Sequence, residues 1–325
     1  MRRALRRFGP PLLGLAAMAG LVLVLNPRHV GRALERFDVR LLPVILALYL
    51  VIYGLQGARW HVLLREVGVR LSLRDGLLLN AAGQTITALV PLGDLTRAAF
   101  AARASGRDFG TVAATVTVQE LTYTLFLVLL AMPELLTLRL GVQVVAITAA
   151  AMAVIVVILT VSPVFHVVHQ LIARIPLLNL LLPAIDELQQ ETAQLLHRPE
   201  TLAWSVLDLA RAAASVAAFW LLVQSVAPGI LDWWQAAFAL ALSSIGGAIS
   251  LLPGGVGANE AGVAGLLIVM GVSAGAAGAI ALLQRALQTG VALGFGLGAY
   301  LAVRRRFDLG GLLQVTVREP ARRAA

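Results

Sequence analysis

Residues 87–97 read TALVPLGDLTR, and residues 249–260 read ISLLPGGVGANE. In each stretch a proline and a glycine interrupt an otherwise apolar run, and Pro91 and Pro253 lie about half the chain length apart. A broken helix in hydrocarbon exposes costly backbone groups, so such breaks persist only inside protein or beside a water-filled cavity. Paired breaks in the two halves of a membrane chain predict a transporter with its substrate site near the bilayer midplane.

The composition indicates an all-α integral membrane protein. The 325 residues are 59% hydrophobic and only 13% charged, with a mean hydropathy of +0.86, whereas soluble domains carry about 25% charge. The chain has no cysteine, which excludes disulfides, thiolate nucleophiles and sulfur-bound metal. Its net charge of +9 comes from arginine without any lysine. On a membrane protein this excess indicates cytosolic loops facing anionic lipid and no nucleic-acid partner.

Segment lengths predict six full transmembrane helices plus two re-entrant helical hairpins. The hairpins cover residues 76–104 and 235–272 and are each interrupted at a proline. They are predicted to enter from opposite sides of the membrane, so that the two halves form an inverted repeat. Two proline-kinked full spans are the alternative. The six predicted crossings are residues 9–25, 41–58, 111–132, 140–161, 201–227 and 275–303.

The arginine distribution predicts one polytopic membrane domain, residues 1–325, with both termini in the cytosol. Repeat 1 covers about residues 41–132 and repeat 2 about residues 201–303. Residues 163–199 mix apolar and charged side chains and are predicted to form a cytosolic interfacial connector. The loop with Arg28, Arg32, Arg36 and Arg40 fits the positive-inside rule less well than the others.

Two ionisable residues in the middle of predicted spans are candidates for function, because buried charge is costly in a membrane. Glu120 and Arg285 each lie on the crossing that follows a hairpin, at nearly equivalent repeat positions. We therefore expect them to face one cavity and to interact, with a structural ion pair as the alternative. Asp208 and Arg211 are three residues apart in one span, a spacing at which they could neutralise each other.

The return halves of both hairpins offer a second candidate feature, a pair of helix N-termini. Asp94 and Asn259 are good N-cap residues, so both helix N-termini are predicted to point into the bilayer centre. Together with Arg97 they would suit an anionic headgroup such as a phosphate; local capping and pairing is the alternative. The sequence carries no Ser/His/Asp order, nucleotide fingerprint or metal-ligand set. We therefore expect no cofactor, no metal and no enzymatic activity.

Three short motifs resemble elements of the lysylphosphatidylglycerol synthase transmembrane-region family. Residues 59–64, RWHVLL, are similar to its Arg-Trp-x-x-Leu-Leu element. Residues 91–97 match Pro-x-Gly-Asp/Glu-x-x-Arg, and residues 253–260 match Pro-x-Gly-x-Gly-x-x-Glu, the most specific of the three. Glu120 falls where the family often has Glu-Arg followed shortly by an acid, whereas this chain has Leu121 and Tyr123 there.

The resemblance implies a lipid translocator of the bacterial inner membrane. The lipid would be an anionic or aminoacylated phospholipid, or an isoprenoid lipid, with its headgroup held at the two broken helices. Aminoacyl transfer is not implied, because the soluble synthase domain has no counterpart here. A non-transporting accessory protein that scaffolds enzymes of lipid, hopanoid or glycan-lipid synthesis is the alternative. The candidate substrate-binding residues are Arg59, Pro91, Gly93, Asp94, Arg97, Glu120, Pro253, Gly254, Gly255, Gly257, Asn259, Glu260 and Arg285.

Overall fold

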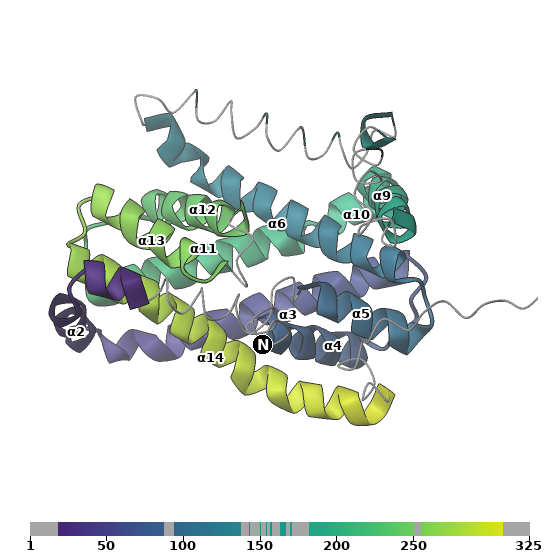
Figure 1. Ribbon diagram of the computed structural model, residues 1–325, viewed down its shortest axis with the longest axis horizontal. Helices are drawn as coiled ribbons and strands as arrows, with labels where there is room; N and C mark the ends of the chain where they lie inside the picture. The colour runs from purple at the N-terminus through teal and green to yellow at the C-terminus, as the bar shows by residue number, and fades with distance from the viewer. Residues whose placement is uncertain are drawn as a thin grey trace, which may run out of the picture.

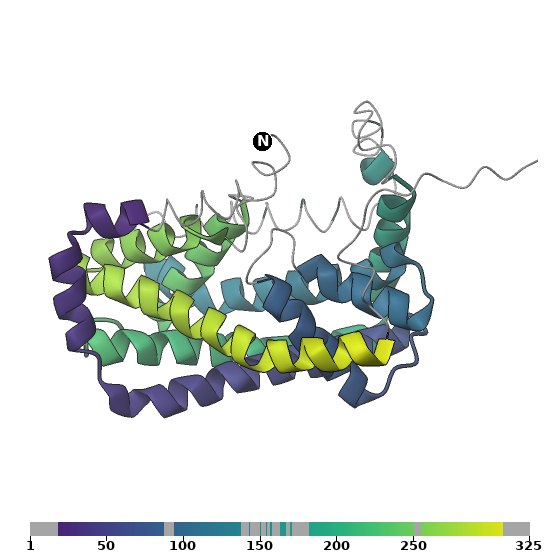
Figure 2. The same cartoon turned by 60° about the horizontal axis from the view of Figure 1, so that its bottom comes forward.

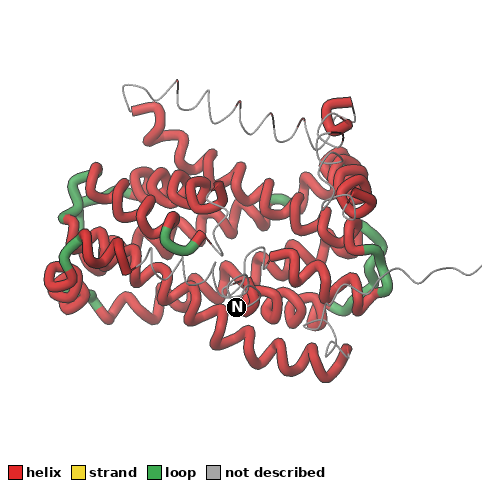
Figure 3. The backbone as a smooth tube through the Cα atoms, in the orientation of Figure 1, coloured by secondary structure: helices red, strands yellow, loops and turns green. Residues whose placement is uncertain are grey.

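The protein is a bundle of helices in which long elements run side by side (Figures 1 and 3). The computed structural model describes residues 19–87, 94–137, 182–249 and 255–307, together with residues 143, 150, 154, 157, 163–166 and 170. The helices in these ranges are α2 (Pro27–Glu35), η1 (Val39–Leu41), α3 (Leu42–Glu66), α4 (Leu73–Thr87), α5 (Asp94–Ser105), α6 (Phe109–Thr137), α9 (Leu182–His197), α10 (Pro199–Trp204), α11 (Val206–Val226), α12 (Trp233–Ile249), α13 (Ala258–Val269) and α14 (Ala274–Phe307).

Among the described residues, four helical segments are long and apolar enough to cross a membrane. They are Val39–Glu66, Phe109–Thr137, Pro199–Val226 and Ala274–Val303, and each has 28 to 30 residues. At about 1.5 Å per residue, each exceeds the roughly 30 Å thickness of a hydrocarbon core. The expectation of an all-helical, multi-pass membrane protein is therefore confirmed. The predicted crossing 9–25 and most of 140–161 lie outside the described residues, so the count of six stays a prediction.

Two pairs of shorter helices pack against each other, α4 with α5 and α12 with α13. Their bounds lie within three residues of the segments expected from the apolar pattern. Small residues allow the close approach: a Cβ added to Gly83 of α4 would lie only 2.5 Å from the Cβ of Arg97 on α5. The two breaks themselves, residues 88–93 and 250–254, lie outside the described part of the chain. They include Pro91, Gly93, Pro253 and Gly254.

The two short pairs lie toward opposite ends of the bundle, and α14 runs along most of its length (Figures 1 and 2). The start of α4 lies beside the end of α14, as the ion pair between Asp75 and Arg306 at 3.2 Å shows. α13 instead leads into the start of α14, where Gly275 packs against His29 of α2. The α4–α5 pair therefore approaches the middle of the bundle from one end, and the α12–α13 pair approaches it from the other.

Within the part of the chain that the structure describes, the buried apolar side chains form two separate clusters, with a band of polar residues between them. Along α3, Ile52 belongs to one cluster and Trp60 to the other. Along α6, the same change occurs between Val118 and Leu127. We call the buried and half-buried polar side chains at this level the polar layer. Its members are Gln56, Arg59, Asn80, Arg97, Gln119, Glu120, Asp208 and Arg211.

Candidate functional site: a buried polar layer and a second ion pair

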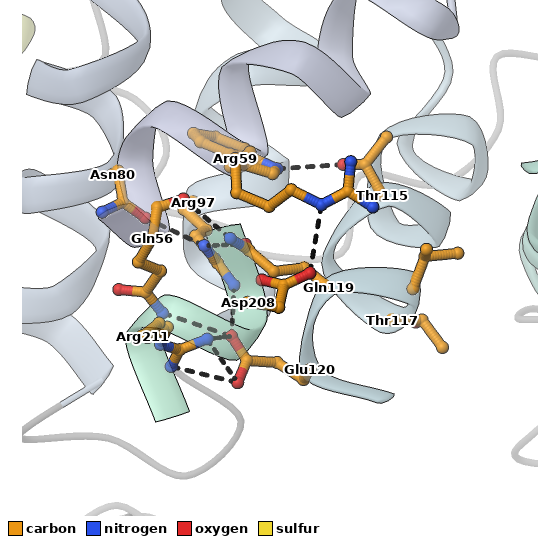
Figure 4. A network of polar contacts seen from close by, with 12 residues as sticks. Gln56, Arg59, Asn80, Arg97, Thr115, Thr117, Gln119, Glu120, Asp208 and Arg211 are labelled. Atoms are coloured by element: carbon orange, nitrogen blue, oxygen red, sulfur yellow. Dashed lines mark hydrogen bonds and ion pairs between the residues drawn. The ribbon is translucent and has the colours of Figure 1, made fainter. Parts of the chain in front are cut away.

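Glu120 is the centre of the polar layer. It lies 11 residues after the start of α6 and 17 before its end, so the carboxylate is deep within the bundle. Three groups from three other helices converge on it (Figure 4). They are Arg97 Nη2 at 2.8 Å, Arg211 Nη1 and Nη2 at 3.2–3.3 Å, and Gln56 Nε2 at 3.2 Å. The Glu120 side chain is nevertheless 32% exposed, whereas the side chains of its partners Arg97 and Arg211 are 0% and 10% exposed.

Arg97 is fully buried and is held on several sides. Its Nη1 donates to Asn80 Oδ1 and to Gln119 Oε1, both at 2.9 Å. Its guanidinium also lies over the ring of Trp60, 5.3 Å from the centroid, within cation–π range. Arg97 has no exposed surface, so in this conformation it cannot contact a headgroup directly. Its role here is to hold the Glu120 carboxylate in position.

Arg211 reaches the layer from α11 and is slightly more accessible than Arg97. Its side chain is 10% exposed, and its guanidinium lies 3.9 Å from the centroid of the Tyr123 ring. The Tyr123 hydroxyl donates in turn to Ser215 Oγ at 3.3 Å. Arg211 therefore supplies a second guanidinium beside Glu120, from a different helix than Arg97.

A second ion pair of the layer is sealed from solvent. Arg59 Nε donates to Asp208 Oδ2 at 3.0 Å, and both side chains are 0% exposed. Thr122 Oγ1 donates to the same oxygen at 2.6 Å, and Arg59 Nη2 donates to the Thr201 carbonyl at 2.9 Å. A buried charge needs such a set of partners, because an unpaired one costs several kcal/mol. This pair joins α3 to α11 and is inaccessible to a substrate in this conformation.

The second candidate cluster lies at the start of α13. Gly257, in a left-handed conformation with φ 87°, is the N-cap, and its N–H donates to Glu260 Oε2. Glu260 is 1% exposed and also accepts a hydrogen bond from Arg285 Nε of α14. Asn259 lies beside Gly247 of α12, and its buried Oδ1 accepts no hydrogen bond from the described residues.

The structure corrects three expectations about partners. Glu120 and Arg285 form separate ion pairs, with Arg97 and Arg211 on one side and with Glu260 on the other. Asp208 and Arg211 likewise pair with other helices, because packing turns each of them toward a different neighbour. Asn259 is not the N-cap of α13: Gly257 takes that place, since glycine adopts the required positive φ at little cost.

The remaining predicted site residues are divided between the two clusters. Arg59, Arg97 and Glu120 meet in the polar layer, whereas Gly257, Glu260 and Arg285 form the second cluster. Gly255 packs against Gly247 of α12 with φ 65°. Of Asp94 the structure describes the backbone, which begins α5, but not the side chain.

Sequence reasoning missed the amides and hydroxyls that complete the polar layer. Gln119 Nε2 donates to the Gln56 carbonyl at 2.7 Å, and Trp60 Nε1 donates to Thr115 Oγ1 at 2.9 Å. A signal was present, since Gln56 and Arg59 are three residues apart in an apolar helix, as are Asp208 and Arg211. Polar residues at helical spacing within an apolar span predict a face turned to the interior.

No group of three or more His, Asp or Glu side chains within the described residues could hold a metal ion. The polar layer instead presents arginines and a carboxylate side by side. Such groups can bind an anionic or zwitterionic headgroup through charge-assisted hydrogen bonds.

Comparison with known families agrees with this architecture. The family model described as the lysylphosphatidylglycerol synthase TM region matches residues 12–296, nearly the whole chain. The chain belongs to this family. A comparison with curated protein sequences finds no match. Membership in the lysylphosphatidylglycerol synthase transmembrane-region family gives the protein a membrane, lipid-related role. The match includes both the polar layer and the Glu260–Arg285 cluster.

Proposed function

We propose that the protein translocates lipids across the bacterial inner membrane and that Glu120 handles the headgroup. The observation that carries this proposal is the partly exposed Glu120 carboxylate, held deep in the bundle by two arginines. An ionisable group at this depth is costly and is a mark of a substrate path. Within this family, an anionic or aminoacylated phospholipid is the substrate class that such a site suits best.

The chemistry of the site fits a headgroup that carries a phosphate. Arg211 is the more accessible arginine, and its planar guanidinium can bind phosphate oxygens through two parallel hydrogen bonds. Glu120 can accept from an ammonium group of an aminoacylated lipid. A bound headgroup would thus replace the internal contact between Glu120 and Arg211. When the headgroup leaves, the two side chains pair again, so neither is left as an unpaired buried charge.

The arrangement of the helices supports an inverted repeat with two re-entrant hairpins. The α4–α5 and α12–α13 pairs approach the middle from opposite ends, and each brings polar side chains there. We propose that the end carrying Arg65, Arg70 and Arg103 faces the cytosol, because basic loops favour that side. The chain termini would then be cytosolic, and the protein would carry out transport without acting as an enzyme.

Lipid translocation can be measured with vesicles that contain the purified protein and fluorescent phosphatidylglycerol or lysylphosphatidylglycerol. The double variant Glu120→Gln/Arg211→Gln removes one charge of each sign, so the net charge is unchanged. It leaves the buried Arg97 without its carboxylate partner, so circular dichroism and size-exclusion chromatography must first show that the variant is folded. Its transport should fall to the rate of protein-free vesicles, whereas Glu35→Gln, an exposed acid on α2, should transport normally. A folded double variant with unchanged transport would refute the proposal and favour the accessory, scaffolding role.

A further inference from the structure

A basic surface pocket, half open to solvent, lies at the end of the bundle where α3 ends and α4 begins; we call it the cavity, and four of its lining residues are exposed. Its volume is about 560 Å³, within the range of small-ligand sites. It is more than a turn of helix away from the polar layer, because Arg65 follows Arg59 by six residues, or about 9 Å along α3. Its lining residues are Arg65, Gly68, Val69, Arg70, Leu71 and Ser72.

A third arginine reaches this cavity from another loop. Gly68 has φ 78°, and a Cβ placed on it would lie only 2.6 Å from Nη2 of Arg107. The guanidinium of Arg107, from the α5–α6 loop, therefore lies directly against a lining residue. Hydrogen bonds fix the loop itself, since the N–H groups of Gly68 and Val69 donate to the carbonyls of Arg65 and Leu64 at 3.0 and 2.9 Å.

The three guanidiniums at this cavity differ from those inside the bundle. Arg65, Arg70 and Arg107 are exposed and form no ion pair within the described part of the chain, whereas Arg59, Arg97, Arg211 and Arg285 all do. The acids of α3 and α4 nearest to Arg65 and Arg70 are engaged elsewhere, and Asp108, which follows Arg107, forms no ion pair with it within the described residues. Glu66 accepts from Thr201, and Asp75 accepts from Ser72 and Arg306.

We propose that this cavity binds a phosphate group through Arg65, Arg70 and Arg107. Guanidinium groups suit phosphate because their planar forks form paired, charge-assisted hydrogen bonds. The half-buried Leu71 lines the same cavity, and the exposed Leu73 follows directly at the start of α4. Apolar side chains beside basic ones at the end of a membrane bundle favour a phosphate carried by an anionic lipid. The site is independent of transport through the polar layer.

The test is binding of short-chain phosphatidylglycerol to the full-length protein in a zwitterionic detergent, measured by microscale thermophoresis. Each comparison is repeated in an Arg211→Gln background, which removes the accessible guanidinium of the polar layer, so that the remaining binding reports the cavity. Losing several charge-assisted contacts should weaken binding by roughly tenfold or more in the triple variant Arg65→Gln/Arg70→Gln/Arg107→Gln. The control is Arg28→Gln/Arg32→Gln/Arg36→Gln, which removes the same charge from exposed positions near α2 and should change binding by less than about twofold. Short-chain phosphatidylcholine, which has no net charge, should bind more weakly to the unmodified protein.

Inorganic phosphate distinguishes the two sources of the ligand. If phosphatidylglycerol binds at least about tenfold more tightly than inorganic phosphate, the cavity takes a lipid headgroup. If the two bind equally well and both lose affinity in the Arg65/Arg70/Arg107 variant, the cavity takes soluble phosphate. Equal losses in the cavity variant and the α2 variant, or no loss in either, would overturn the proposal. The single change Arg70→Gln, at an exposed position, provides a second test: its loss of affinity for phosphatidylglycerol should lie between zero and that of the triple variant.

Discussion

Replacing Asp208 by asparagine should destabilise the protein strongly, because it leaves the Arg59 guanidinium uncompensated. Both side chains are fully buried and are joined at 3.0 Å. Removing one partner of such a pair typically costs about 3–5 kcal/mol, which is more than a hundredfold in the unfolding equilibrium. Arg59→Met should cost a similar amount, because Asp208 would keep only the hydroxyl of Thr122 as a donor to its paired oxygen.

The double variant Arg59→Met/Asp208→Leu should recover much of this loss. Two apolar side chains of similar volume can replace a buried ion pair with little or no cost. What remains is the Thr201 carbonyl, which loses the hydrogen bond from Arg59 Nη2. A buried group left without its partner costs about 1–3 kcal/mol. The free energy of unfolding of the double variant should therefore be roughly 2 kcal/mol higher than that of either single variant.

The assay is reversible unfolding by SDS in mixed micelles, followed by circular dichroism. Arg306→Met is a matched control, because Arg306 is 53% exposed in its pair with Asp75 and should contribute less than about 1 kcal/mol. If the double variant loses the sum of the two single losses, Arg59 and Asp208 do not compensate each other. The reasoning about the sealed pair would then be refuted.

Two further predictions concern glycines at the broken helices. Gly83→Ala should lower stability by about 1–3 kcal/mol, since the new methyl would meet Cβ and Cα of Arg97 at 2.5 and 3.1 Å. Thermal midpoints in detergent would show this against Gly54→Ala, which faces open space; equal midpoints would mean that α4 and α5 are not in close contact. Gly257→Ala should cost about 1–3 kcal/mol because alanine is strained at φ 87°. Gly265→Ala, also in α13, should be tolerated because a Cβ added there would meet no other part of the protein within 4 Å; equal tolerance of both changes would contradict the assigned cap.

Helix positions were largely predictable from the sequence, because they depend on local apolar length and on prolines. The segments expected at residues 76–90 and 94–104 correspond to α4, Leu73–Thr87, and α5, Asp94–Ser105. The charged members of the polar layer could also be singled out one by one from the sequence, whereas its amides and hydroxyls were missed. Their partners could not be predicted. The partner of a buried charge depends on how each helix is rotated about its axis, and long-range packing sets that rotation.

The case of α11 shows this limit most clearly. Asp208 and Arg211 have a spacing that allows a local ion pair. In the structure Asp208 instead meets Arg59 of α3, and Arg211 meets Glu120 of α6. Each cross-helix contact joins side chains that would otherwise bury a charge alone.

The sealed Arg59–Asp208 pair and the partly exposed Arg211–Glu120 pair are connected through the same helices. Asp208 and Arg211 are about one turn apart on α11, and so are Gln56 and Arg59 on α3. The contact between Arg59 and Asp208 fixes the register of α3 against α11, and Thr122 ties α6 to the same carboxylate. Once this register is fixed, Gln56 and Arg211 both arrive at Glu120. The Arg59–Asp208 pair, which has no exposed surface, therefore positions the partly exposed Glu120 and Arg211, and this gives two buried charges a structural role.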